Sequence, residues 1–469
     1  MATEFIENHP YDEIRVGQSA ELQRTLTRDD IALFGKVSGD LNPTHLDQEF
    51  ASSSAAGEIT GHSLWNSGLI SSLLGNVLPG PGTVYRKQDM QFHRPVALDD
   101  TVTARIKVRE KRDDHVVLFD CDVVNQRGET VMTGVAEVST PTEKLSVPKA
   151  ELPEVSVRHH DSYAQLIEAA GALEPIFTAV IHPCDFNSLK GAVEAANDGL
   201  IIPVLVGPEE RIRAVADEHG IELADYRIIN VAHSHAAAAR AVELVHEGVA
   251  EILMKGSLHT DEVLSAVVSK STGIRTERRI SHIFAMDVPT YEKVLLITDA
   301  AVNIAPDLMA KRDICQNAID LAHTFQIEEP RVAILSAVET VNPSIQSTLD
   351  AAALCKMADR GQIQGGVLDG PLAMDNAINL EAARTKGITS PVAGQADVVI
   401  APNLEAGNIL AKQLTFMAKA DAAGVVLGAR VPIVLTSRAD NVRTRRASAA
   451  TAVMHAHALR RNVVSGFKR

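Results

Sequence analysis

The sequence is poor in aromatic residues, in cysteine and in unbroken hydrophobic runs. Only 4% of its 469 residues are aromatic, so its cores must be built from aliphatic side chains. The four cysteines lie far apart without a CxxC pair, which predicts neither a zinc site nor a disulfide framework. No apolar run approaches the ~20 residues that cross a bilayer, and the acidic start lacks the apolar segment of a signal peptide. These absences predict a cytoplasmic protein.

Basic residues are also in deficit. The chain has 45 Lys and Arg against 60 Asp and Glu, a formal net charge of −15 at pH 7. Because binding a phosphate backbone needs a basic surface, this balance argues against nucleic acid as a partner. The length predicts roughly two to four domains at ~100–200 residues each. The 45% of hydrophobic and 22% of charged residues are typical of globular folds.

The hydrophobic pattern changes near residue 150. Before that point, an almost wholly apolar helical stretch at 63–78 is followed, from Thr101, by three alternating segments with turn signals at 112–115 and 125–128. A helix that is apolar all round must be buried, and alternation between turns predicts an antiparallel meander. We therefore predict an α+β domain over residues 1–142, in which a curved sheet wraps one central helix.

A different architecture is predicted for the rest of the chain. Residues 143–158 contain prolines and mixed charge, which fits an interdomain linker. In residues 159–469, apolar strand-like runs alternate with alanine-rich helical stretches, which predicts an α/β fold with a largely parallel sheet. The length favours two lobes with a cleft, lobe 1 from about 159–298 plus 442–469 and lobe 2 from about 299–441.

One candidate catalytic pair lies in the string SGDLNPTHLD. Asp40 and His45 flank Asn42-Pro43, and the proline disfavours helix at Asn42, which predicts a turn that brings carboxylate and imidazole together. Such a pair can orient one water and move its proton. Spacing alone favours the alternative, in which Asp40 caps a turn and His45 starts a helix.

The surrounding sequence resembles the MaoC-like R-specific enoyl-CoA hydratases over about residues 12–140. The strings that carry the resemblance are VSGDLNPTHLD and ITGHSLWNSGLISSLLGNVLPGPGTVYRKQDMQFHRPVALDDTVTARI. The resemblance implies the hot dog fold. It also implies that Asp40 and His45 activate the water added across a trans-2-enoyl-CoA, which gives an R-3-hydroxyacyl-CoA.

The buried helix of that family usually opens with a His-Gly pair, whose backbone N–H groups polarise the thioester carbonyl. Here the pair is His62-Ser63. A backbone donor at the helix N-terminus survives this change, but the Ser63 side chain takes up space beside the acyl group. His62 either touches the substrate or anchors the start of the helix.

Polar strings follow several apolar strands in the second part of the chain: KGSLHT, DAAVN, DGPLAMD, PNLEAGN and TSRAD. Ligands bind beyond the carboxyl ends of strands in open α/β sheets, so these strings together predict a cleft. No Walker A, GxGxxG or HExxH sequence occurs, which removes the usual signatures of ATP-dependent transfer, dinucleotide binding and zinc proteolysis. Ser437 and Arg438 offer a hydroxyl and a guanidinium suited to a phosphoryl group, although such pairs are common on surfaces.

The strings KGSLHT, ITDAAVN, DGPLAMDNAI, SPVAGQADVVIAPNLEAGN and VPIVLTSRAD resemble, in order, the phosphate acetyltransferase and phosphate butyryltransferase family over about residues 160–469. The resemblance implies a two-lobed α/β fold that exchanges an acyl group between coenzyme A and phosphate, without a covalent enzyme intermediate or a redox cofactor. It implies that Ser437 and Arg438 contact the acyl phosphate. The residues implied to line or brace the cleft are Asp299, Asn303, Asp369 and Asn408.

One position departs from the acetyl branch of that family. The branch has an aspartate seven residues after the matching serine, proposed as the base for the coenzyme A thiol, and this chain has Thr444 there. Asp440 lies closer to Ser437, and TSRAD and LSAVETVNP look more like the butyryl branch. The base is therefore open, because clustered arginines can also favour the thiolate.

Other side chains have two interpretations each. Arginines in IRTERRIS are candidates for binding phosphate or the coenzyme A tail, or else form a solvated face: Arg275, Arg278 and Arg279. Cys184 follows an apolar strand, where a lone cysteine is more often buried packing than a nucleophile.

We expect a bifunctional enzyme, an enoyl-CoA hydratase fused to a phosphate acyltransferase. Its substrates are acyl-CoA, enoyl-CoA and phosphate, and no metal, NAD or ATP is needed. Hot dog sheets need cover for their edges, which predicts a homo-oligomer. Two alternatives stay open. In one, the first domain is a catalytically dead dimerisation module; in the other, the second part is a coenzyme A binding or regulatory lobe.

Overall fold

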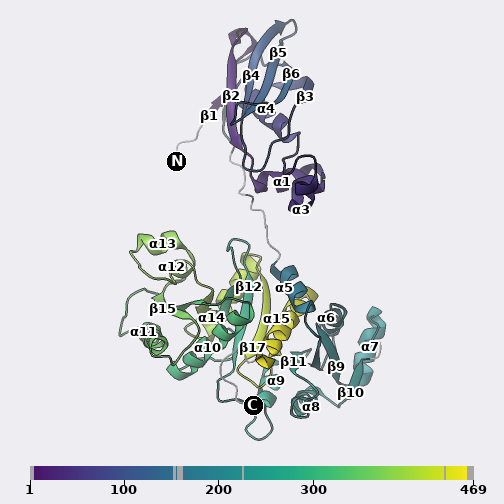
Figure 1. Cartoon of the computed structure of the whole chain (residues 1–469), viewed down its shortest axis with the longest axis vertical. Helices are drawn as coiled ribbons and strands as arrows, with labels where there is room; N and C mark the ends of the chain where they lie inside the picture. Colours follow the sequence, from purple (N-terminus) through teal and green to yellow (C-terminus); the bar gives the residue numbers. More distant parts are fainter. Residues whose placement is uncertain (1–4, 151–154, 156–161, 224–225, 438–439, 462–469) are drawn as a thin grey trace. The chain divides into compact units, whose positions relative to one another are not determined.

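The computed structural model describes residues 5–150, 155, 162–223, 226–437 and 440–461. The chain divides into two compact units, Met1–His159 and His160–Arg469 (Figure 1). Each unit has its own hydrophobic core. The core of the first unit is built from residues between Ile14 and Val138. The second unit has several hydrophobic clusters, built from residues between Tyr163 and Ala456.

The first unit is a five-stranded antiparallel sheet with helix α4 (Trp65–Asn76) packed against it, as Figure 1 shows. This confirms the predicted α+β architecture. The strands, in sheet order, are β2 (Ser19–Thr25), β4 (Thr101–Arg112), β5 (Val116–Asn125), β6 (Thr130–Ser139) and β3 (Val84–Phe92). The other elements are β1 (Phe5–Glu7), paired with β7 (Ser146–Pro148), a 3-10 turn at Tyr11–Glu13, α1 (Arg28–Ser38), α2 (Pro43–Leu46) and α3 (Gln48–Ser53).

Helix α4 buries one face rather than its whole circumference. Its buried residues recur in pairs four residues apart, at Trp65, Asn66, Leu69, Ile70, Leu73 and Leu74. This spacing puts them on one stripe of a 3.6-residue helix. Serine and glycine occupy much of the other face, so the helix presents its large side chains to the core and its small ones away from it.

The predicted meander is confirmed, and its turns are built as the sequence indicates. At the β5–β6 turn, Oδ1 of Asn125 accepts from the backbone N–H groups of Arg127 and Glu129, both at 3.0 Å, and Gly128 takes a φ of 76°. An Asn side chain that bonds its own turn is a standard way to reverse a strand. These turns align β4, β5 and β6 against each other.

The second unit contains one sheet of eleven strands, which runs without a break through both predicted lobes. In sheet order the strands are β10 (Arg227–Asn230), β9 (Ile201–Gly207), β8 (Ile176–Ile181), β11 (Ile252–Lys255), β18 (Ile433–Val434), β17 (Asp421–Leu427), β12 (Ser281–Asp287), β13 (Leu295–Thr298), β16 (Val398–Ile400), β14 (Arg331–Leu335) and β15 (Val367–Leu372).

The sheet reverses direction at its centre. Strands β8 to β11 and β18 are mutually parallel, and β13 to β16 are mutually parallel. Between them, β17 is antiparallel to β18, and β12 is antiparallel to both β17 and β13. The two parallel halves therefore run in opposite directions. The carboxyl ends of β11 and β18 therefore point in the opposite direction to those of β13 and β16.

Helices surround both halves of this sheet (Figure 1). They are α5 (Ser162–Gly171), α6 (Phe186–Asn197), α7 (Glu209–His219), α8 (Ser234–His246), α9 (Thr260–Val267), α10 (Leu308–Thr324), α11 (Gln346–Asp359), α12 (Met374–Ile378), α13 (Leu380–Thr385), α14 (Leu404–Met417) and α15 (Val442–Arg460). Helices α10 and α15 pack against each other and are largely buried.

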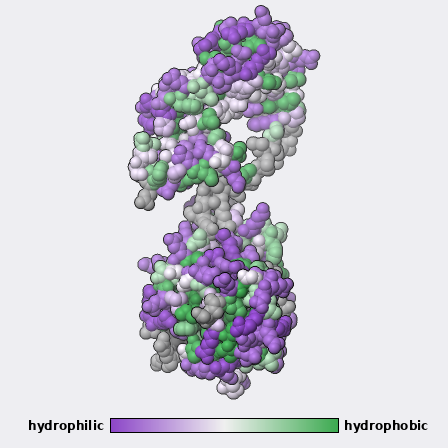
Figure 2. Space-filling model, turned by 90° about the vertical axis from the view of Figure 1, so that its right-hand side faces the viewer, coloured by the Kyte–Doolittle hydropathy of each residue, from purple (hydrophilic) through white to green (hydrophobic). Residues whose placement is uncertain are grey.

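Hydrophilic residues cover much of the visible surface of both units in Figure 2, with smaller hydrophobic areas between them. Among the described helices, none combines the length and the apolar character that crossing a membrane requires.

Candidate functional sites

Asp40 and His45 are brought together by the predicted turn. Helix α1 ends at Gly39, whose φ of 76° suits a glycine. Oδ1 of Asp40 then accepts from the backbone N–H of Asn42 at 3.2 Å. The side chain of Asn42 in turn caps α2 by accepting from the N–H of Thr44 at 3.1 Å. Each of these residues therefore has the local role that its type favours, and the pair is formed as predicted.

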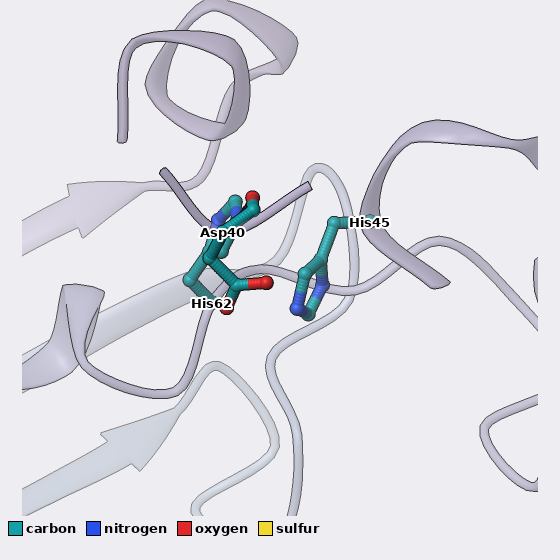
Figure 3. Close-up of side chains that lie close together, drawn as sticks. All are labelled: Asp40, His45 and His62. Carbon is teal, nitrogen blue, oxygen red and sulfur yellow. Dashed lines mark hydrogen bonds between the residues drawn. The ribbon is translucent and has the colours of Figure 1, made fainter. Parts of the chain in front are cut away.

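The hydrogen bonds of His45 fix its tautomer. Its Nδ1 lies 2.7 Å from the carbonyl oxygen of Thr60, which can only accept, so Nδ1 carries the proton in the neutral ring. The lone pair is then at Nε2. Figure 3 shows the carboxylate of Asp40 pointing toward the His45 ring. A carboxylate and a basic imidazole nitrogen on either side of one small space can bind and deprotonate a water.

His62 holds the backbone of this site in place. It is buried, and its Nε2 donates to the carbonyl oxygen of Asp40 at 3.0 Å. Its ring lies 4.1 Å from that of His45, centroid to centroid, and 5.1 Å from that of Phe34. His62 therefore anchors the turn to the segment before α4, which is one of its two predicted roles. Ser63, next in the chain, is exposed.

Asp40, His45 and His62 also have the residue types of a metal site. One ligand atom from each lies within 4.8 Å of the others. Nδ1 of His62 is buried without a hydrogen-bond partner among the described residues. Nothing in this arrangement requires a metal, and the absence of a metal site stays a prediction.

In the second unit, Asp299 holds the loop after β13 in place through hydrogen bonds within the protein. Its buried carboxylate accepts five hydrogen bonds, from the backbone N–H groups of His282, Ala301, Val302 and Asn303 and from the Asn303 side chain. With its oxygens so engaged, it shapes the loop after β13. Asn303 also donates to the carbonyl oxygen of Ile280 at 2.9 Å.

Asn408 braces the same loop from helix α14. Its side chain donates to the carbonyl oxygen of Ala300 at 3.0 Å. The neighbouring Gly407 lets the helix approach closely, because a Cβ there would lie 2.2 Å from the carbonyl oxygen of Asp299. Asp299, Asn303 and Asn408 thus form one hydrogen-bonded group around the loop after β13, and their place in a substrate cleft stays a prediction.

Asp369 lies elsewhere. The string DGPL forms part of the edge strand β15 rather than a loop after a strand, which corrects the predicted position of that string. Oδ1 of Asp369 accepts from the N–H of Gly370. Six strand positions separate β15 from β18, where TSRAD follows, or roughly 29 Å at ~4.8 Å per strand. Asp369 is therefore well separated from the TSRAD loop.

The TSRAD loop joins β18 to α15. Ser437 is exposed, and its backbone N–H donates to Oδ2 of Asp440 at 2.6 Å. Arg438 lies outside the described residues. Asn441 caps α15 by accepting from the N–H of Thr444 at 2.9 Å, so Thr444 occupies the first turn of that helix. Asp440 is therefore the carboxylate that the structure brings to Ser437.

The three arginines of the string IRTERRIS have different surroundings. Arg278 forms a salt bridge with the buried Asp320 of α10, while Arg275 and Arg279 are exposed. The pairing ties the Arg278 guanidinium to the protein interior.

Cys184 is half-buried, and burial raises the pKa of its thiol to about 11. This favours packing over a nucleophilic role, because the thiolate is the reactive form.

Three functional candidates were missed in the sequence: Lys255, His282 and Arg445. All are buried basic residues that contact Leu435 or the first two residues of TSRAD. Lys255 opens the string KGSLHT, which was the one available signal. His282 lies at the start of the antiparallel strand β12, and nothing in the local sequence marks that strand as the reversal of the sheet.

A family model described as "Phosphate acetyl/butaryl transferase" matches residues 233–453. A phosphate acetyltransferase of Rhizobium meliloti is 65% identical over 294 residues, which cover 63% of this chain and 93% of that protein. The chain belongs to the phosphate acetyl/butyryltransferase family. The branched-chain phosphotransacylase of Enterococcus faecalis V583 is 28% identical and matches with a TM-score of 0.53, covering 60% of this chain and 99% of that one.

A second family model, described as a MaoC like domain, matches residues 13–120. The unliganded R-hydratase PhaJ1 from Pseudomonas aeruginosa is 42% identical, with a TM-score of 0.32 and coverage of 33% of this chain and 99% of that one. The family models together describe a fusion: a MaoC-like hot dog domain precedes the phosphate acetyl/butyryltransferase domain.

Proposed function

We propose that this member of the phosphate acetyl/butyryltransferase family is a bifunctional coenzyme A ester enzyme. The second unit reversibly transfers a short acyl group between coenzyme A and inorganic phosphate. The first unit adds water to short trans-2-enoyl-CoA to give the R-3-hydroxyacyl-CoA. Both halves act on short acyl-CoA, so joining them in one chain keeps the acyl-CoA products at a high local concentration.

For acyl transfer, the proposed site is the loop after β18. The coenzyme A thiolate attacks the carbonyl carbon of the acyl phosphate, and inorganic phosphate leaves; the reverse reaction exchanges these roles. Ser437 and Arg438 bind the phosphoryl oxygens. Asp440, held to the backbone of Ser437 through Oδ2, takes the thiol proton in place of the aspartate that Thr444 replaces. A thiol with a pKa of ~8.5 needs only modest help to ionise near neutral pH.

For hydration, the single observation that carries the proposal is the grouping of Asp40, His45 and His62 within 4.8 Å, with the lone pair of His45 at Nε2. The water binds between the Asp40 carboxylate and Nε2. Its oxygen forms the new bond to C3 of the enoyl group, one of its protons passes to the pair, and C2 receives a proton. Backbone N–H groups before α4 polarise the thioester carbonyl.

The transferase can prefer either acetyl or butyryl as the transferred group. Identity to the R. meliloti phosphate acetyltransferase supports acetyl, whereas TSRAD and LSAVETVNP resemble the butyryl branch. We propose acetyl as the preferred group, because the identity extends over nearly the whole of that relative.

The first experiment measures release of free coenzyme A from acetyl-CoA and from butyryl-CoA, with and without phosphate. We expect phosphate-dependent release, faster with acetyl-CoA, and no requirement for added NAD, ATP or zinc. Faster release from butyryl-CoA would reverse the preference. No release from either ester would overturn the proposed transfer and leave the second unit as a coenzyme A binding lobe.

The second experiment incubates the full chain with crotonyl-CoA and follows loss of the enoyl absorbance and the chirality of the product. We expect R-3-hydroxybutyryl-CoA. An active transferase without hydration would support the alternative, in which the hot dog domain is a catalytically dead dimerisation module.

We also propose a homo-oligomer acting in the cytoplasm. Strand β3 is an edge of the first sheet, and it carries exposed Val84, Tyr85 and Phe92. An apolar edge strand needs cover. Light scattering after gel filtration should give a mass above the 50.3 kDa of one chain, and a monomer would contradict this.

A further inference from the structure

Three buried basic side chains meet three consecutive carbonyl groups just after β18. Nε2 of His282 donates to the carbonyl oxygen of Leu435 at 3.2 Å. Nζ of Lys255 donates to that of Thr436 at 3.3 Å, and Nη2 of Arg445 donates to that of Ser437 at 3.1 Å. The donors are at most 3% exposed and come from β12, β11 and α15.

These contacts begin where the strand pairing ends. The last residue of β18, Val434, is still in register with Met254 of β11. From Leu435 on, side chains instead of a neighbouring strand satisfy the carbonyl groups. The chain can therefore leave the sheet at Ser437 while each peptide before it stays fixed.

Burying a charged side chain, such as the Arg445 guanidinium, is costly. Removing a cation from water is repaid only in part by hydrogen bonds to neutral carbonyl groups. Nε of Arg445 has no hydrogen-bond partner among the described residues. An apolar side chain would fill the same space without this penalty, so the arrangement suits a purpose other than stability.

Arg445 is the member of this group nearest to the proposed chemistry. It follows Thr444 in the first turn of α15, and its Nη2 contacts the same residue whose hydroxyl is proposed to meet the phosphoryl group. Helix α6 makes room for it, because Gly191 has no side chain there. A Cβ at Gly191 would lie 2.7 Å from Cδ of Arg445.

We infer that Arg445 is a positioning residue for acyl transfer: with Lys255 and His282 it holds segment 435–437 so that Ser437 presents its N–H to Asp440 and its hydroxyl to the phosphoryl group. This inference rests on the proposed function of the Ser437 loop. Arg445 acts through the backbone of Ser437.

The surrounding charges are consistent with this role. Burial lowers the pKa of the Arg445 guanidinium, while the charges of Asp185 and Asp440 act in the opposite direction. An arginine stays protonated in proteins. Its charge therefore interacts with Asp185, which caps α6, and with the carboxylate proposed as the base.

The test compares Arg445→Met, Arg445→Lys and Gly191→Ala with the wild type in the full chain, by phosphate-dependent release of coenzyme A. For Arg445→Met we expect kcat to fall about 10²-fold, the scale for misplacing a reacting group by about 1 Å. The KM for phosphate should rise while the KM for acetyl-CoA stays unchanged. Arg445→Lys keeps a donor and should recover part of the loss, and Gly191→Ala should give a milder form of the same change.

Arg446→Met is the matched control. Arg446 is the next residue of α15 and makes two hydrogen bonds to Asp198, at 2.6 and 2.7 Å, so its loss tests a comparable disturbance of the helix. Its kcat and KM values should match those of the wild type.

The outcomes separate cleanly. If the wild type is active and Arg445→Met has the same kcat and KM values, the inference is wrong. The inference is also wrong if the activity lost in Arg445→Met and in Arg446→Met is proportional to the fall in melting temperature of each variant. An inactive wild type would instead refute the proposed transfer activity.

Discussion

Nδ1 of His45 donates to the carbonyl oxygen of Thr60 at 2.7 Å, and this contact fixes the tautomer of the neutral ring. It places the lone pair at Nε2, where the carboxylate of Asp40 points toward the ring (Figure 3). The neutral ring is thereby held in the tautomer that can accept a proton at Nε2, as the proposed hydration requires.

Replacing Asp40 with Asn should abolish hydration of crotonyl-CoA, with a loss of about 10²–10⁴-fold, the usual range for general acid–base groups. The fold should survive, because the amide oxygen can still accept from the N–H of Asn42. Asp47→Asn is the matched control, since Asp47 accepts from the N–H of Phe50 at the start of α3 and is not part of the group of Asp40, His45 and His62. Unchanged turnover in Asp40→Asn would exclude this carboxylate from the proton transfer.

Replacing Ser63 with Gly should speed hydration and admit longer acyl chains. In the proposed hydratase site, the change removes a side chain beside the acyl group and keeps the backbone donor before α4. Turnover of crotonyl-CoA and of a longer enoyl-CoA, compared with the wild type, checks this. Slower turnover of both substrates would mean that the serine hydroxyl helps the reaction.

Replacing Gly407 with Ala should lower acyl transfer and destabilise the second unit by about 1–3 kcal/mol, the usual cost of overpacking. The added Cβ would lie 2.2 Å from the carbonyl oxygen of Asp299, so α14 or the loop after β13 must shift. Denaturant unfolding and coenzyme A release measure the two effects. A fully stable and active Gly407→Ala variant would show that this loop is free to move.

The thiols should resist modification in the folded protein. Burial is the main cause that raises the pKa of Cys184 to about 11 and those of Cys121 and Cys355 to about 12. Little thiolate is then present at pH 8. A thiol reagent should react slowly until denaturant is added, and Cys184→Ala should keep acyl transfer. Rapid loss of activity on modification of Cys184 would contradict this.

Acid should weaken the second unit through His455. Burial, and then the charge of Arg278, lower the pKa of this ring to about 4, below the ~6.5 of an unfolded chain. Between these values the unfolded state binds the proton and the folded state does not, so stability falls as pH falls from 6.5 toward 4. The contribution is about 3 kcal/mol. In His455→Asn, the free energy of unfolding should depend less steeply on pH across this window.

The first unit follows closely from its sequence, because its determinants are local. The turn around Asn42-Pro43, the alternating strands and the β5–β6 turn at Asn125 each depend on residues within a few positions of one another. Asp40 and His45 could be paired for the same reason. The burial of only one face of α4 could not, since serine and glycine do not differ enough from apolar residues to mark an outer face.

The second unit shows where such inference ends. The alternation of strands and helices was predicted, but β12 was not, and the directions of β12 and β17 depend on contacts far along the chain. The five polar strings were predicted to form a cleft together, but DGPL forms part of strand β15. The strings after β13 and β18 are linked by His282, which contacts both Asp299 and Leu435. Likewise, Lys255, His282 and Arg445 become a group only through β11, β12 and α15, which are separated by up to about two hundred residues in sequence.

The closing of the second unit by its final helix has a consequence during synthesis. Helix α15 is tied to the beginning of that unit, through Arg446 with Asp198 and through His457 with the carbonyl oxygen of Glu174. Strand β11 likewise gains its neighbour β18 only near the end of the chain. The first unit, by contrast, has all its strands once β7 is made. On the ribosome the first unit is therefore free to fold early, while the second unit stays incomplete until β18 and α15 have emerged.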